Sequence, residues 1–220
     1  MSINFDTIVK DPTIKAYIKK ADESLISLGY TEHSFAHVYK VASNVEMILR
    51  GLGYSEHEID LGKIAAYLHD IGNVINRIEH SQSGAVMAFR ILDKLEMPAE
   101  DIATVITAIG NHDEGTGVPV NPIAAALIIA DKSDVRRTRV RNSQITTFDI
   151  HDRVNYSVVS SELKIDPIER NIILELKIDT EISPVMEYFE IFLERMLLCR
   201  KASETLGMKF SLVINNQKLL

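Results

Sequence analysis

The chain has 220 residues, of which 46% are hydrophobic and 25% charged, an ordinary composition for a globular protein with one sizeable core. Its 24 basic and 31 acidic residues give a net charge of −7, which argues against nucleic acid or an anionic membrane as the main partner. The first ten residues lack the apolar core of a signal peptide, no apolar run could span a bilayer, and the single cysteine excludes an internal disulfide. We therefore expect a cytoplasmic protein.

Apolar residues recur with a helical period through the first two thirds of the chain. Ser55 and Glu58 have the reciprocal spacing of a capping box, and Gly72 is expected to end the helix that this box begins. A further helix begins at Pro122 and is predicted to continue into a basic tract that reaches Arg141. The helices expected before it cover residues 12–28, 34–49, 55–70, 83–95 and 98–112.

From Tyr156 the apolar period changes to two, which is typical of strands. Residues 174–178 and 210–214 alternate in this way, and between them Ser183 and Pro184 begin a helix that extends to Gly207. We therefore predict a mainly α protein, in which a helical bundle over residues 1–148 precedes a small ββαβ unit over residues 149–220. The second unit is called the C-terminal unit below.

Six histidine and aspartate side chains fall in line with the apolar stripes of separate helices. An unpaired polar side chain on such a stripe would be costly, so a cation held between the helices is the simplest explanation. Consecutive helical residues diverge by about 100°, so His69 and Asp70 suit two edges of one site. The candidate metal ligands are His37, His69, Asp70, His80, His112 and Asp131.

The segment His69-Asp70-Ile71-Gly72 resembles the signature of the HD superfamily. The order His37, His69-Asp70, Asp131 is similar to its four-residue metal motif. The additional His80 and His112 resemble the binuclear branch, which includes the HD-GYP phosphodiesterases and HD-fold diadenosine tetraphosphate hydrolases. The resemblance covers roughly residues 31–141. No Gly-Tyr-Pro segment follows the HD pair, and His112 is followed by Asp113 rather than by a second histidine.

The resemblance implies an HD-domain helical bundle with two divalent metal ions. His37, His69, Asp70 and Asp131 would hold the first ion, and Asp70 would bridge to a second held by His80 and His112. A water between the ions would attack phosphorus, which makes His69 and Asp70 the implied catalytic residues. Mn²⁺ or Fe²⁺/Fe³⁺ suits such a donor set, with Mg²⁺ as a further option.

Three cationic residues are candidates for binding a substrate phosphate: Lys132 and Arg136, just beyond Asp131, and Arg77, just beyond the HD turn. Cations at a helix end also complement the helix dipole, so a purely structural role is the alternative. Asp113 and Glu114, beside His112, have either a role in proton transfer or a role as a loop cap.

The sequence predicts a metal-dependent phosphohydrolase that cleaves a phosphomonoester, a nucleotide or a phosphoanhydride. Its expected partner is a small phosphorylated substrate, and a homodimer through the C-terminal unit is a further option. Two alternatives use the same residues. One is an HD-fold di-iron oxygenase, because imidazole-rich sites also suit iron. The other is a nucleotide-binding signalling domain.

Overall fold

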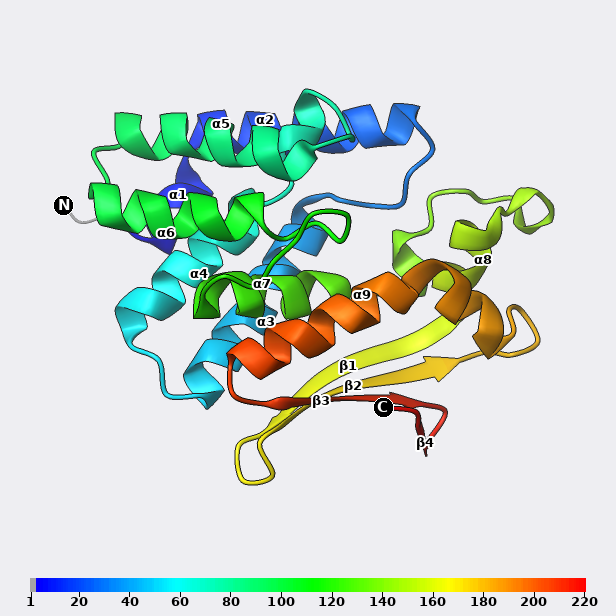
Figure 1. Cartoon of the computed structure of the whole chain (residues 1–220). Helices are drawn as coiled ribbons and strands as arrows, with labels where there is room; N and C mark the ends of the chain where they lie inside the picture. Colours follow the sequence, from blue (N-terminus) through cyan, green and yellow to red (C-terminus); the bar gives the residue numbers. More distant parts are fainter. Residues whose placement is uncertain (1–2) are drawn as a thin grey trace.

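The computed structural model describes residues 3–220, and Figure 1 shows helices packed over one face of a small sheet. The predicted fold class, a mainly α bundle with a small α+β unit at the C-terminus, is confirmed. The helices are α1 (Phe5–Lys10), α2 (Pro12–Ser27), α3 (Phe35–Gly51), α4 (Glu56–Leu68), α5 (His80–Lys94), α6 (Ala99–Gly110), α7 (Pro122–Lys132), α8 (Ile150–Ser157) and α9 (Val185–Thr205). The strands are β1 (Val158–Asp166), β2 (Asn171–Ile178), β3 (Lys209–Ile214) and β4 (Gln217–Lys218).

Helix α7 is the centre of the bundle. Every residue from Ile123 to Ala130 is buried, and the helix contacts α3, α4, α6 and α9. A helix that is apolar on all sides is stable only when other elements surround it. Asp131 and Lys132 end this helix, so the fold carries two charged side chains into the interior.

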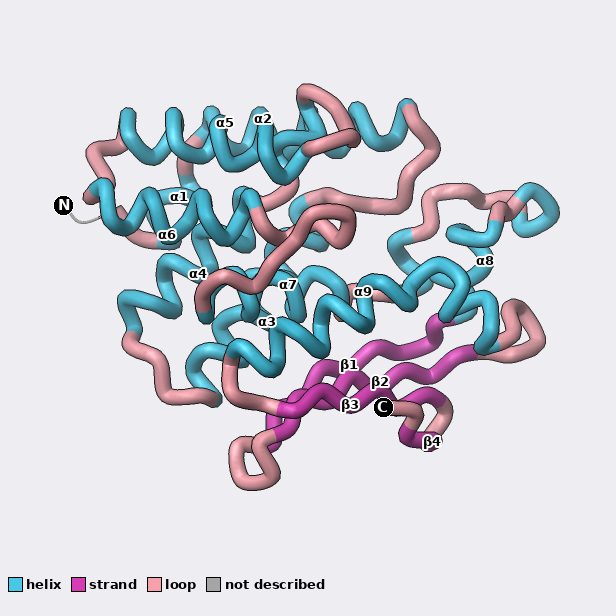
Figure 2. The backbone as a smooth tube through the Cα atoms, viewed as in Figure 1, coloured by secondary structure: helices cyan, strands magenta, loops and turns pink. Residues whose placement is uncertain are grey.

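The sheet has the order β1-β2-β3-β4. Strands β1 and β2 pair antiparallel, whereas β2 and β3 are parallel and are connected through α9. Leu174, Leu176 and Ile178 are buried on the face that α9 covers, and the residues between them are partly or fully exposed. Figure 2 shows the three-stranded part of the sheet extending beneath α9, which therefore lies between the sheet and α7.

The helices around the predicted metal ligands differ from the expected ranges at their ends. The capping box of Ser55 and Glu58 is present, but α4 ends at Leu68, and a short 3₁₀ turn over Ile71–Val74 follows. Glu79 has a φ of 56°, in the left-handed region, and this turn allows α5 to begin at His80, three residues earlier than predicted. The histidine thereby lies in the first turn of α5 rather than in the loop before it.

Helix α7 also differs from the prediction, because it ends at Lys132 instead of continuing through the basic tract. The Ser133 hydroxyl donates to the carbonyl of Ala130, a side-chain bond that competes with continued helix. Arg136 then has an extended backbone, with a φ of −158°. Lys132 and Arg136 consequently do not share a helix face, as they would have done on a helix that continued to Arg141.

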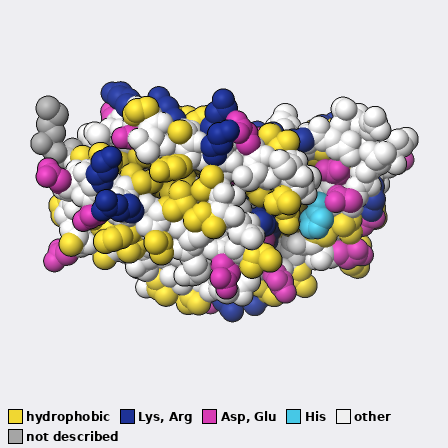
Figure 3. Space-filling model, turned by 90° about the horizontal axis from the view of Figure 1, so that it is seen from above, with side chains coloured by type: hydrophobic (Ala, Val, Ile, Leu, Met, Phe, Trp, Pro, Cys, Tyr) yellow, Lys and Arg dark blue, Asp and Glu magenta, His cyan; other side chains and the backbone are white. Residues whose placement is uncertain are grey.

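No helix within residues 3–220 is long and apolar enough to cross a membrane. Figure 3 shows apolar side chains gathered on the face seen from above, with lysine and arginine side chains beside them. The exposed apolar residues include Val86 and Phe89 of α5 and Ile78 just before it.

Candidate metal centre

The structure brings all six predicted metal ligands together, and each lies at or next to a helix end. His37 is in the first turn of α3, His69 follows α4, and His80 begins α5. His112 comes two residues after α6 ends, and Asp131 is the second-last residue of α7. Five helices therefore each direct one end at a common point. The four imidazoles are almost completely buried, and Asp70 is 6% exposed.

Asp70 lies between two groups of imidazole nitrogens. Its Oδ2 atom is 3.6 Å from Nε2 of His37 and 3.3 Å from Nε2 of His69. Its Oδ1 atom is 3.5 Å from Nε2 of His80. One carboxylate thus faces both sides of the cluster, as expected for a group that bridges two cations.

The remaining contacts complete two adjoining sets of donor atoms. Oδ1 of Asp131 is 3.3 Å from Nε2 of His37 and 3.7 Å from Nε2 of His69. On the other side, the Nε2 atoms of His80 and His112 are 3.2 Å apart. Two imidazole lone pairs at this separation repel each other unless a proton or a metal ion lies between them.

Each histidine is oriented by an acceptor at its other ring nitrogen. The acceptors are Asp134 Oδ2 for His37 (2.7 Å) and the carbonyls of Ala66 for His69 (2.7 Å), Arg77 for His80 (3.1 Å) and Ile109 for His112 (2.6 Å). If Nδ1–H donates to these oxygens, the lone pair of every Nε2 atom is directed to the centre.

Three buried atoms at the centre have no hydrogen-bond partner within residues 3–220: Nε2 of His37, Nε2 of His69 and Oδ2 of Asp70. A buried polar atom without a partner costs about 1–3 kcal/mol. A divalent metal ion accepts such nitrogen and oxygen donors at once, so the residues present fit a metal site. Groups of His37, His69 and Asp70, of His69, His112 and Asp131, and of Asp70, His80 and His112 each place donor atoms close enough to share one ion.

Most of these side chains have the protonation state that a metal ion requires. Burial opposes the charge of Asp131, but Lys132 and the imidazoles of His37 and His69 together outweigh it, and the pKa of Asp131 lies well below its ordinary value. Burial lowers the pKa of His112 well below its ordinary value and also lowers the pKa of His80. These imidazoles are neutral at pH 7, and a neutral imidazole and an ionised carboxylate are the forms that bind metal.

Comparison with known proteins agrees with this geometry. Residues 34–138 match the family profile of the HD domain, and this range contains all six candidate ligand positions. This part of the chain is an HD domain. An uncharacterized protein of Methanocaldococcus jannaschii is 27% identical to it over 184 residues, which cover 73% of this chain and 70% of that protein.

A solved structure is also similar to the chain. It is described as a predicted HD superfamily hydrolase from an uncultured Thermotogales bacterium. The two chains share 23% sequence identity, with a TM-score of 0.45, over 56% of this chain and 67% of the other.

Within the HD domain, Asn73 and Gly72 support the ligands. The Nδ2 atom of Asn73 donates to Oδ1 of Asp70 at 3.0 Å and to the Asp70 carbonyl at 2.9 Å, so the amide orients the Asp70 carboxylate. A Cβ atom on Gly72 would lie 2.0 Å from the His80 carbonyl oxygen. Only glycine therefore allows the start of α5 to approach the turn after His69-Asp70.

The cavity at the metal centre is strongly cationic at its rim. It is lined by four of the candidate ligands, Asp70, His80, His112 and Asp131, and by His33. Four cations complete the lining: Arg77, Lys132, Arg139 and Arg195. Two of the predicted substrate-binding residues, Lys132 and Arg77, are thus at the site. Arg136 is not: it pairs with Asp134 (Nε to Oδ1, 2.8 Å) and with Glu32 (Nη2 to Oε2, 3.2 Å).

Lys132 forms ion pairs with two carboxylates. Its Nζ atom lies 2.7 Å from Oδ2 of Asp131 and 2.6 Å from Oε2 of Glu114. Burial opposes the charge of Glu114, but Lys132 and Arg195 outweigh it, so the pKa of Glu114 is lowered. Glu114 is therefore ionised at neutral pH and cannot supply a proton to a leaving group; it holds cations in place instead.

Sequence reasoning missed two contributors to the site: Asp134, which orients His37, and Arg195, which reaches the rim from α9. It singled out Glu114 but not the role that the structure gives it, which is to connect Lys132 to α9. Arg195 lies one helical turn beyond the buried Phe192 and beside the buried Met196, so the apolar stripe of α9 placed it near the interface. The sequence did not show that this stripe packs on α7.

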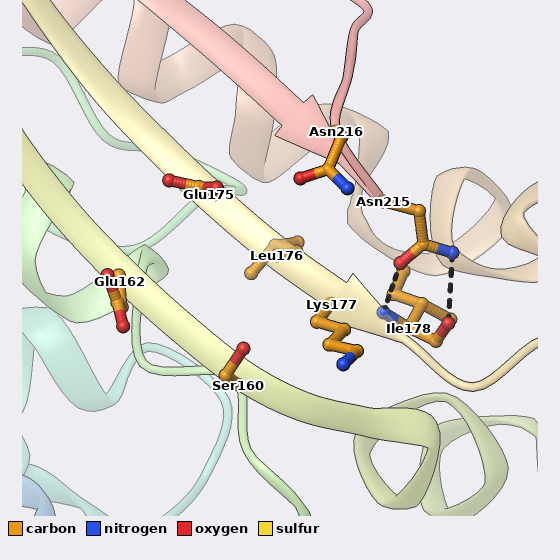
Figure 4. Close-up of a pocket in the computed structure, with 8 residues that line it drawn as sticks. All are labelled: Ser160, Glu162, Glu175, Leu176, Lys177, Ile178, Asn215 and Asn216. Atoms are coloured by element: carbon orange, nitrogen blue, oxygen red, sulfur yellow. Dashed lines mark hydrogen bonds between the residues drawn. The ribbon is translucent and has the colours of Figure 1, made fainter.

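Figure 4 shows a different cavity, of about 350 Å³, on the C-terminal unit. It is lined by residues of β1, β2 and the β3–β4 turn, among them Glu162, Glu175 and Lys177. The Asn215 side chain accepts from the Ile178 amide (2.8 Å) and donates to its carbonyl (3.0 Å), which ends β2. No histidine lines this cavity, so the metal centre remains the candidate functional site.

Proposed function

We propose that the chain is a metal-dependent phosphohydrolase acting on a small organic phosphate: a phosphomonoester, a nucleotide or a phosphoanhydride. The observation that carries the proposal is that Asp70 lines a cavity together with four cationic side chains, while its orphaned Oδ2 atom lies beside the orphaned Nε2 atoms of His37 and His69. Unpaired donors favour a metal ion, and the cations favour an anionic ligand next to it. A hydrolase of the HD superfamily accounts for both.

Under this proposal His37, His69, Asp70 and Asp131 hold one divalent ion, and Asp70, His80 and His112 hold a second. The bound ions supply a nucleophilic water at neutral pH and neutralise charge on the phosphoryl oxygens. Mn²⁺ or iron suits four imidazoles better than Mg²⁺, which prefers oxygen ligands.

The protein's own side chains do the positioning. Asp134 and three backbone carbonyls fix the imidazole rings, Asn73 fixes Asp70, and Lys132 fixes Asp131. Arg77 lies on the substrate side, where its Nη1 atom is 3.1 Å from Nε2 of His80 and its guanidinium is 5.6 Å from the centre of the Tyr30 ring. A phosphoryl group next to His80 would therefore meet the Arg77 guanidinium.

The test combines metal analysis with a phosphate-release screen. Freshly purified protein is expected to contain about two metal equivalents, and to release phosphate from one class among nucleotides, sugar phosphates and phosphoanhydrides when Mn²⁺ or Fe²⁺ is supplied. Asp70→Asn should lose both the metal and the activity. Absence of phosphate release from every class would contradict the proposal, and O₂ consumption by iron-loaded protein would favour the oxygenase alternative.

A further inference from the structure

A third cavity, of about 560 Å³, adjoins the metal centre where the HD domain meets the C-terminal unit. We call it the junction cavity. It is lined by the segment from Leu28 to His33, by Arg77 and Arg139, and by residues of α8 and α9. Its volume is in the range of small-molecule sites, roughly 300–1,000 Å³. The two cavities share four lining residues: His33, Arg77, Arg139 and Arg195.

Arg195 is the member of this set that comes from α9, outside the HD match. Its Nε atom donates to Oε1 of Glu114 at 2.8 Å, and its guanidinium lies 4.5 Å from the centre of the Phe192 ring. Phe192 is 2% exposed and is fixed in the core. These two contacts hold the plane of the guanidinium, and the Nε bond to Glu114 is the only hydrogen bond of the Arg195 side chain within residues 3–220. The N–H groups of the two Nη atoms, side by side on the guanidinium, are therefore available to a ligand.

Two other cations of the rim are more heavily used by the protein. Lys132 is paired with Asp131 and Glu114. Arg139 donates from Nη1 to the Asp134 carbonyl (2.7 Å) and from Nε to the Glu32 carbonyl (2.9 Å). Compared with these two, Arg195 therefore offers two adjacent N–H groups at a smaller cost in existing contacts.

Glu114 connects Arg195 to the metal centre. One of its carboxylate oxygens holds Arg195 and the other holds Lys132, which in turn holds Asp131. The chain Arg195–Glu114–Lys132–Asp131 links α9 to the end of α7, against which α9 packs. Figure 1 shows α9 running alongside α7 towards α8. The position of the guanidinium is thus set by docking of the C-terminal unit.

We propose that Arg195 binds the phosphate of the substrate, so that the C-terminal unit completes the active site. This inference rests on the proposed phosphohydrolase function and names its substrate class further. The phosphoryl group lies between the metal centre and Arg195, and the organic part occupies the junction cavity. Asp149 and Asp152 of the α8 region line the junction cavity but not the metal centre. The organic part therefore carries hydroxyl or amino groups that donate to carboxylates.

The test measures binding of inorganic phosphate to the metal-loaded, full-length protein by calorimetry, together with metal content. Arg195→Gln is expected to weaken phosphate binding at least tenfold while metal content stays at the parent value. Arg195→Lys keeps the charge but loses the paired N–H groups of the guanidinium, so its phosphate affinity is expected to lie between those of the parent and of Arg195→Gln. The matched control is Arg200→Gln, which removes an exposed cation from the same helix and is expected to bind phosphate like the parent.

Equal phosphate binding by the parent and by Arg195→Gln would overturn the assignment of Arg195, and so would loss of metal from Arg195→Gln, because the residue would then act only through Glu114 and Asp131. In both cases the parent still binds phosphate, and the proposed function stands. If the metal-loaded parent itself binds no phosphate, the proposed function fails together with the inference.

Discussion

Nδ1 of His37 lies 2.7 Å from Oδ2 of Asp134, a carboxylate 97 residues further along the chain. Asp134 is 3% exposed and also accepts from Nε of Arg136. Burial opposes its charge, but the hydrogen bond from His37 and the charge of Arg139 outweigh it, so the pKa of Asp134 is lowered. An ionised, buried carboxylate therefore orients a candidate metal ligand, as partners of metal-binding histidines commonly do.

Asp134→Ala is expected to lower metal affinity about 10–100-fold, because the His37 ring loses the partner that fixes its orientation. The measurement is a competition titration against a chelating dye. The control is Asp101→Ala, which removes the carboxylate 2.8 Å from the exposed His57 and leaves the centre intact. Unchanged metal affinity of Asp134→Ala would show that the pair does not support the metal.

The number of metal ions is tested at His80. Its Nε2 atom lies 3.2 Å from that of His112 and 3.5 Å from Oδ1 of Asp70, on the side away from His37. His80→Ala is therefore expected to retain one of two metal equivalents, measured by elemental analysis after gel filtration. His57→Ala, at an exposed histidine, should retain both. Loss of both ions from His80→Ala would indicate one shared site instead of two.

Metal binding is expected to release a proton from His69. Burial opposes its charge, but Asp70 and Asp131 outweigh it and raise the pKa of His69 to about 10. Without metal the ring is thus protonated at pH 7, and an ion must displace that proton to reach Nε2. Metal affinity should rise with pH, by up to about tenfold per unit, until the pH approaches 10. Calorimetry in two buffers with different ionisation enthalpies measures the released proton; pH-independent affinity would contradict it.

The same shift has a consequence for the metal-free protein. Because the folded pKa of about 10 exceeds the ordinary value of 6.5, the charged His69 stabilises the fold fully below pH 6.5. That contribution is lost as the pH rises through 10. With metal added, the stability of the fold should instead rise with pH, since the ion then replaces the proton on His69.

Much of this site was predictable because its ligands lie on regular helices or directly beside their ends. The apolar stripes that include His37, His69 and Asp131 are visible in the sequence, and they point inward in the structure as expected. The supporting groups were not predictable in the same way. Asp134 follows α7, where the helix was expected to continue, and Glu114 lies in a loop with no period of its own. Their roles depend on tertiary contacts between segments far apart in sequence.

In the C-terminal unit, too, the elements were predictable from the sequence but their tertiary contacts were not. Its ββαβ order follows from alternation and from the Ser183-Pro184 helix start, and the structure confirms it and adds the two-residue strand β4 at the end. Helix α8 was not predicted, because its eight residues are mostly polar. The packing of α9 on α7 depends on two apolar faces that each could meet several partners. The approach of Arg195 to the metal centre follows from that packing alone.

Gly72 is expected to be essential for the geometry of the centre. A Cβ atom there would lie 2.0 Å from the His80 carbonyl oxygen and 2.5 Å from the Gly84 amide nitrogen, both backbone atoms that cannot move alone. Gly72→Ala should destabilise the protein by roughly 1–3 kcal/mol or more and lower its metal content. Thermal unfolding and elemental analysis measure both. Gly115→Ala is the control, because its nearest atom lies 4.0 Å away; equal effects would contradict the steric argument.

The thiol of Cys199 reports whether α9 stays docked on α7. Cys199 is fully buried, and burial raises its pKa to about 12. At pH 8 only about one thiol in ten thousand would be ionised, so a disulfide reagent should react with the native protein extremely slowly and with the unfolded protein at once.

The positive control is Arg200→Cys in a Cys199→Ala background, which places a thiol at the next, exposed position of the same helix and should react immediately. If Cys199 reacts only when α9 leaves α7, then bound metal and phosphate should slow the reaction further, because Arg195 lies on the same helix and Glu114 connects it to Lys132. Fast reaction of native Cys199, or a rate that ligands leave unchanged, would show that the C-terminal unit opens independently of the metal centre.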